Sequence, residues 1–89
     1  ALSELGECVS APGGVEQEAE AAALAESLNR FLEALPQEKR VLFVRRYWYL
    51  CSIEELAAWS GKRRGTVSAA LHRMRQALRE HLEKEGFTV

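Results

Sequence analysis

The sequence predicts an all-α protein, a small bundle of four helices with a C-terminal helix-turn-helix. Apolar residues recur at spacings of three and four in successive segments, which is the period of an amphipathic helix. A Leu-Pro step, a Ser-Ile-Glu-Glu box and a Ser-Gly pair separate these segments, and each is a typical helix boundary. The 89 residues are 47% hydrophobic and 28% charged, which fits one small globular domain.

The N-terminal part divides into a leader and the start of the domain. Residues 1–20 are predicted to be a flexible acidic leader or linker, because residues 1–14 lack periodicity and contain a Pro-Gly-Gly run. The domain is predicted to span residues 21–89. Helix formers dominate from about residue 15, and whether the alanine-rich stretch 16–23 already belongs to the first helix stays open at this point. The chain does not begin with methionine, which suggests a piece of a longer protein.

The first helix is marked by an apolar stripe and ends at a proline. The stripe consists of Leu24, Leu28, Phe31, Leu32 and Leu35. The step Leu35-Pro36 ends this helix and begins the second, because proline suits the first helical position and disfavours helix in the residue before it.

The second helix is predicted to have a wide apolar face. Its aliphatic members are Val41, Leu42 and Val44. Three aromatic residues, Phe43, Tyr47 and Trp48, accompany them. In so small a domain such a cluster is most simply the main source of buried area, so we expect core packing rather than a stacking platform for nucleic-acid bases.

The third helix has the clearest start signal in the chain. Residues 52–55 form a capping box, in which the Ser52 hydroxyl accepts from the Glu55 amide and the Glu55 carboxylate accepts from the Ser52 amide. Cys51 and Leu56 are placed to form the hydrophobic staple across this box. The buried side is expected to hold Leu56 with Ile53, Ala57 and Trp59. The helix should end at Ser60-Gly61, where glycine can take the left-handed conformation.

The fourth helix, from near Gly65, has two different faces. The inward stripe is Val67, Leu71, Met74, Leu78 and Leu82. The opposite side of the helical wheel holds Thr66, Ala69, His72, Arg73 and Gln76, with Arg75 and Arg79 flanking the stripe. A short capped helix, a tight turn with glycine and a longer helix form the bihelical unit that reads DNA.

Charge is distributed asymmetrically although the net charge is only −1. Residues 1–33 hold seven glutamates and one arginine, whereas residues 34–89 hold eleven basic residues and six glutamates. Between Gly61 and Arg79 there are six basic residues and no acidic one. This basic block suggests a polyanionic partner. The acidic N-terminal third could fold back over the basic face and weaken DNA binding.

The turn and the fourth helix are the candidate DNA-binding elements. Lys62, Arg63 and Arg64 precede the positive end of the helix dipole, which suits phosphate anchoring. His72 and Arg73 project a turn or two further on, where base edges would lie.

Four motifs in this order resemble region 4 of bacterial sigma factors of the sigma-70 family, and the extracytoplasmic-function subgroup most of all. They are Leu35-Pro36, residues 40–48 (RVLFVRRYW), residues 52–57 (SIEELA) and residues 65–79 (GTVSAALHRMRQALR). The resemblance implies recognition of the promoter −35 element and docking on the β flap of core RNA polymerase. It also implies a bacterial, cytoplasmic, nucleoid-associated protein, with an anti-sigma factor as a further partner. Region 2 of the family is absent, so the chain alone is not expected to start transcription.

The resemblance also assigns positions on the fourth helix. Those that face DNA in the family are occupied here by Thr66, Ser68, Ala69, His72 and Arg73. The family often has a basic residue where Ser68 and Ala70 stand, an apolar residue in place of Lys62 and a serine-like cap in place of Arg63. These departures move positive charge from the helix into the turn, which leaves the promoter sequence open.

Two other functions remain open. One is a free-standing helix-turn-helix regulator that dimerises through its N-terminal helix. The other is an interaction module that docks on polymerase or an anti-sigma factor without reading DNA, an option favoured by the small residues Ser68 and Ala69 at reading positions.

Several classes are not expected. An enzyme is not, because the sequence has no glycine-rich phosphate loop, no nucleophile with a paired base and no converging carboxylates. No cofactor or metal is expected, because Cys8 and Cys51 lack the spacing of zinc ligands. We expect Cys51 to be a buried or half-buried apolar residue rather than half of a disulfide. No membrane span is expected, since no apolar run approaches the roughly 20 residues required.

Overall fold

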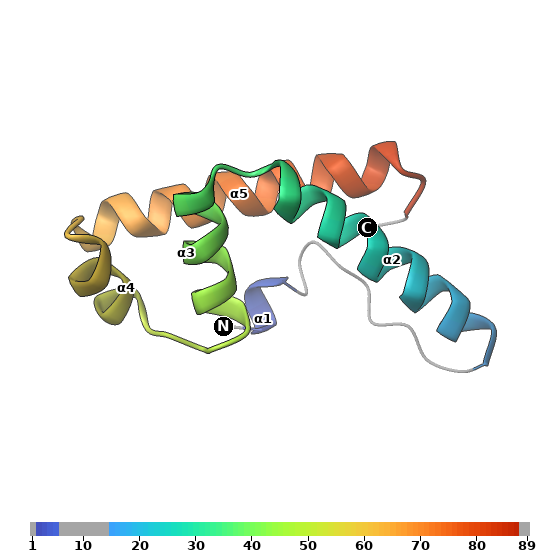
Figure 1. Cartoon of the computed structure of the whole chain (residues 1–89), viewed down its shortest axis with the longest axis horizontal. Helices are drawn as coiled ribbons and strands as arrows, with labels where there is room; N and C mark the ends of the chain where they lie inside the picture. The colour runs from blue at the N-terminus through green and yellow to red at the C-terminus, as the bar shows by residue number, and fades with distance from the viewer. Residues whose placement is uncertain (1, 6–14, 88–89) are drawn as a thin grey trace.

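The boundary signals of the sequence produce five helices in the computed structural model, which describes residues 2–5 and 15–87 (Figure 1). They are α1 (Leu2–Leu5), α2 (Val15–Ala34), α3 (Gln37–Tyr47), α4 (Ile53–Ser60) and α5 (Arg64–Lys84). The described residues contain no strand, so the all-α prediction is confirmed. All four predicted helices are present, and α2 includes the alanine-rich stretch. The single turn α1, inside the predicted leader, was not predicted, and residues 6–14 of that leader lie outside the described residues.

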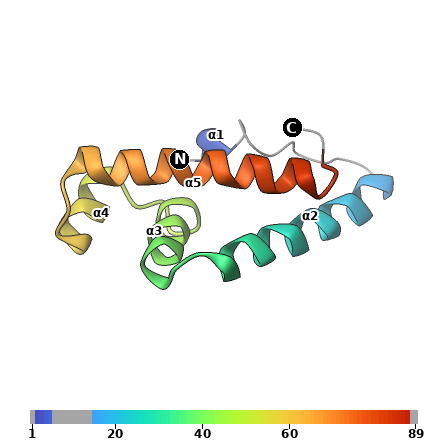
Figure 2. The same cartoon turned by 90° about the horizontal axis from the view of Figure 1, so that it is seen from above.

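The longest helix, α5, is the element on which the others pack. α4 lies on its N-terminal part, α3 on its middle and α2 beside its C-terminal part (Figures 1 and 2). α3 also contacts α4. The residues on the side of α5 turned away from these helices are exposed, as a DNA-reading helix requires.

One hydrophobic core joins α2, α3, α4 and α5. The inward stripe predicted for α5 is confirmed, with exposed fractions of at most 4% for Val67, Leu71, Met74, Leu78 and Leu82. Leu56 of α4, Leu42, Phe43 and Tyr47 of α3, and Phe31 and Leu32 of α2 complete the buried cluster. The rest of the α2 stripe packs against it half-buried, as do Cys51, Ile53 and Ala57.

The helix ends follow the local signals of the sequence. Ser52 Oγ accepts from the Glu55 amide at 3.0 Å, and Glu55 Oε1 accepts from the Ser52 amide at 3.1 Å, which confirms the capping box. The hydrogen bond from the Ser52 amide lowers the pKa of Glu55. Gly61 stops α4 with a φ of 72°, a left-handed conformation that disfavours a side chain. Pro36 is the N-cap of α3 rather than its first helical residue.

The prediction that three aromatic residues of the second helix form the core is wrong for one of them. Phe43 and Tyr47 are buried, but Trp48 is 53% exposed. α3 ends at Tyr47, and Leu50 adopts a positive φ of 55° that turns the chain toward α4. Trp48 still has a helical backbone conformation, and its amide donates to the carbonyl oxygen of Val44. It follows Tyr47 directly, about 100° further round the helix, and so lies outside the buried side of α3.

Trp59 is also more exposed than the third-helix prediction allowed. It is 46% exposed, and its ring lies 4.4 Å from the guanidinium carbon of Arg45. This cation–π contact joins α4 to the outer side of α3 instead of adding to the core. None of the described helices is long and apolar enough to span a membrane.

Candidate nucleic-acid interface

α4 braces the N-terminal part of α5 through the core. Leu56 is 1% exposed and Val67 is fully buried, and Ala57 packs half-buried beside them. The turn between the helices is short, Gly61 to Arg63, and α4 lies across the start of α5 rather than splayed away from it (Figure 1). Because the buried residues of α5 pack into the core, this packing fixes how the exposed side of α5 is oriented relative to the rest of the domain.

All eight residues predicted to contact DNA are exposed. Three of them lie in the turn or at the start of α5: Lys62, Arg63 and Arg64. The other five lie within the first ten residues of α5: Thr66, Ser68, Ala69, His72 and Arg73. The structure therefore brings the whole set to one end of the molecule.

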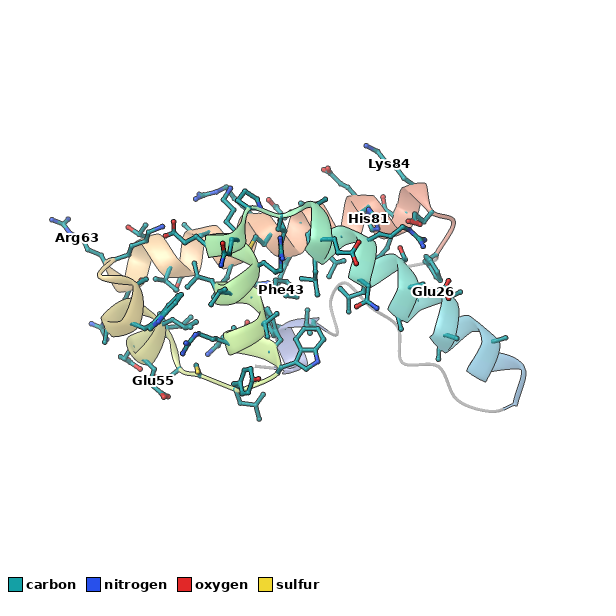
Figure 3. All side chains as sticks on the ribbon, in the orientation of Figure 1. Glu26, Phe43, Glu55, Arg63, His81 and Lys84 are labelled. Carbon is teal, nitrogen blue, oxygen red and sulfur yellow. The ribbon has the colours of Figure 1, made fainter. Side chains whose placement is uncertain are left out.

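The three cations of the turn have different surroundings. Lys62 forms an ion pair with Glu38 at the start of α3, with Nζ and Oε1 2.6 Å apart, and this contact lowers the pKa of Glu38. Arg64 pairs with Glu54 of α4 at 3.2 Å. Arg63 is the N-cap residue of α5, and its side chain extends outward at the end of the molecule (Figure 3). The basic block contains no acid in sequence, but the fold brings acidic residues to it.

The arginines along α5 also differ from one another. Arg75 is turned inward: its side chain is 17% exposed, and its Nη1 donates to the Tyr47 hydroxyl at 2.8 Å. Arg79 pairs with Glu83 one turn further on, at 3.3 Å. Within residues 2–5 and 15–87, Arg63 and Arg73 are the members of the basic block with no ion pair. These two cations are therefore the most readily available to phosphate or bases.

Sequence reasoning missed a second surface, on the outer side of α3. Arg40, Val41, Val44, Arg45 and Tyr49 line a hollow of about 430 Å³. Next to it along the chain, Trp48, Tyr49 and Leu50 are 53–74% exposed. A signal was present in the sequence, because Val41 and Val44 stand three apart on a flank of α3 that adjoins the side of Phe43 and Tyr47.

The described turn of the acidic leader contacts the domain away from the eight predicted residues. Glu4 forms ion pairs with Arg46 of α3 and Arg75 of α5. Residues 6–14, on which the fold-back hypothesis also depends, lie outside the described residues.

The chain is similar to known bacterial proteins along most of its length. The family described as Sigma-70, region 4 matches residues 25–78. The RNA polymerase sigma-E factor of Streptomyces avermitilis is 39% identical over 74 residues, which cover 83% of this chain and 39% of that protein. The sigma-E factor of Streptomyces antibioticus is 40% identical over 68 residues, covering 76% of this chain and 36% of that protein.

A third relative comes from a different genus. The ECF RNA polymerase sigma factor SigD of Mycobacterium bovis is 37% identical over 77 residues, covering 86% of this chain and 36% of that protein. This chain thus spans less than two fifths of the length of these relatives. No solved structure gives a significant match.

The family match covers the helices from α2 to the middle of α5, and therefore both the brace and the exposed face described above. The relatives cover more than three quarters of the chain at 37–40% identity. The chain therefore belongs to the sigma-70 region 4 family, in the extracytoplasmic-function group.

Proposed function

We propose that this chain recognises the promoter −35 element during bacterial transcription initiation, as a non-enzymatic DNA-binding module. The observation that carries the proposal is the braced helix α5 with its exposed outer side and N-terminal end. There lie Arg63 and Arg73, the two basic-block cations that form no ion pair with any described residue. They stand ten positions apart, about 15 Å along a helix. This spacing lets Arg63 contact the DNA backbone while Arg73 reaches into the major groove.

The remaining predicted residues have complementary roles in this proposal. Lys62 and Arg64 exchange their glutamate partners for phosphates when DNA arrives. Ser68 and Ala69 are small, so the helix can enter the groove closely. Discrimination between bases then rests on Thr66, His72 and Arg73.

We further propose that the hollow on α3 is the surface that docks on core RNA polymerase, at the β flap. Two valines, two arginines and Tyr49 line it, and Tyr49 and the neighbouring Trp48 are exposed. Aromatic residues and arginine are enriched at protein interfaces. An anti-sigma factor would act by covering this same surface. The proposed location is the cytoplasm of a bacterium, in association with the nucleoid.

The test is a binding selection on randomised duplexes, with and without a β-flap fragment. A single enriched sequence is expected, and the fragment should tighten its binding. Neutralising three or four phosphates should make log K fall with log salt at a slope of roughly −3 to −4. A salt-independent affinity would contradict DNA reading and favour an interaction module.

Arg73→Ala separates base reading from general attraction. It should lower the preference for the selected sequence by roughly 1–3 kcal/mol. Arg79→Ala is the matched control, because it removes the same charge from a side chain that already pairs with Glu83. Equal effects of the two changes would argue against base reading. Sedimentation with DNA should find one chain per site, whereas a two-fold operator would require a dimer.

A further inference from the structure

Three side chains from two helices converge on one carboxylate. Arg46 Nη2 of α3 donates to Glu4 Oε1 at 2.7 Å, and Arg75 Nη1 of α5 lies 3.3 Å from Glu4 Oε2. The Tyr47 hydroxyl donates to Glu4 Oε2 at 2.9 Å. Both carboxylate oxygens are therefore bound, by groups that belong to different packed elements.

This cluster is held in place by its surroundings. The Tyr47 residue is 3% exposed, and the side chains of Arg46 and Arg75 are 14% and 17% exposed. Arg46 Nη1 also donates to the carbonyl oxygen of Cys51 at 2.9 Å, which anchors the guanidinium. Arg75 donates to the Tyr47 hydroxyl, and the hydroxyl donates onward to Glu4. Such a fixed arrangement of charged and neutral donors is typical of an anion-binding site.

The protonation states agree with this geometry. The hydrogen bond from Arg46 holds the pKa of Glu4 below its ordinary value. Burial raises the pKa of Tyr47 to about 12, so its hydroxyl keeps the proton that it donates. Glu4 is thus an anion and all three of its neighbours are donors at neutral pH.

We propose that Arg46, Tyr47 and Arg75 form a carboxylate-binding site whose occupant is Glu4 of the chain's own N-terminal segment. Occupied, the site makes α1 a latch that fastens the C-terminal end of α3 to the middle of α5. Leu5, half-buried against the core, completes the attachment. Neither the family match at residues 25–78 nor the proposed DNA reading involves Glu4.

The latch has a consequence for the DNA-reading helix. Arg75 stands two residues after Arg73 and three after His72, on the flank of α5 next to the outer face. By tying this flank to α3, Glu4 helps to set the orientation of α5. It also holds α1 at the side of the domain, away from the eight predicted DNA residues, all of which are exposed among the described residues.

The first experiment follows the position of the leader in the full chain. A spin label on Cys8, in a Cys51→Ala background, should broaden the amide signals of α5 around Arg75, because Cys8 is only three residues beyond Leu5. Glu4→Gln keeps the shape and removes the charge, so the broadening should be lost. Glu26→Gln, an exposed carboxylate on α2, is the control and should leave the broadening intact. Broadening that survives Glu4→Gln overturns the proposal.

The second experiment measures the coupling across the site. In a cycle of Glu4→Gln, Arg75→Gln and the double variant, the unfolding equilibrium constant should reveal a coupling of about tenfold, as for a partly buried charge-assisted pair. Glu26→Gln combined with Arg75→Gln should give no coupling. Additive effects of Glu4→Gln and Arg75→Gln would also overturn the proposal. If Arg75→Gln fails to fold, the spin-label comparison decides by itself.

Discussion

The substitution Leu56→Ala tests whether α4 braces the DNA-reading helix. Leu56 is 1% exposed and lies in the core between α4 and α5. The change removes three buried carbon atoms, worth about 2.4 kcal/mol in transfer free energy, and the cavity brings the expected loss to about 3–4 kcal/mol. A chain of 89 residues is expected to have a total stability of about 4–13 kcal/mol, so the loss is a large fraction of it.

Urea denaturation followed by circular dichroism measures this loss, and an unchanged m-value would show that the transition stays two-state. Leu50→Ala is the matched control, since it is the same chemical change at a residue that is 58% exposed. It should cost less than about 1 kcal/mol. If the two variants lose equal stability, Leu56 does not hold the two helices together as described.

Three further predictions follow from the ion pairs and caps. Ser52→Ala should lower the unfolding free energy by about 1 kcal/mol in the same urea assay, because the amide of Glu55 loses its acceptor; no loss would mean that the cap does not contribute. Glu38→Gln should tighten DNA binding several-fold at low salt, because Lys62 then has no competing carboxylate. A fluorescence-anisotropy titration should show this gain in affinity vanish at high salt. A gain that does not depend on salt would contradict the proposed cause. Folding lowers the pKa of Glu4, so its contribution to stability is complete above the ordinary pKa of 4.5 and is lost as the pH falls through the lower pKa of the folded state. The difference in unfolding free energy between wild type and Glu4→Gln should therefore shrink on acidification. A difference that stays constant with pH would argue against an ionised Glu4 in this contact.

Local chemistry was enough to predict most of the helical framework. The stripe of α5 was read from apolar spacing alone, and all of its members are buried. The capping box at Ser52 and the left-handed Gly61 were likewise predictable, because a cap depends on residues within one turn of each other. The exposed positions of the eight candidate residues followed from the same helical period.

The surroundings of the candidate cations were not predictable in this way. The basic block has no acid in sequence, yet Lys62 meets Glu38 and Arg75 meets Glu4, its partner 71 positions away. The outward positions of Tyr49 and Leu50 depend on where α3 ends and on the positive φ of Leu50, not on any spacing rule.

The sequence by itself therefore determined that α2, α3, α4 and α5 are helices, where most of them begin or end, and which side of each is apolar. Only the tertiary structure decided which cations are paired, which aromatic residues reach the surface, and that α1 lies against α3 and α5. The physical reason is that helical periodicity and capping arise from interactions between residues a few positions apart. Ion pairs and docking surfaces depend instead on which elements the packed core brings together.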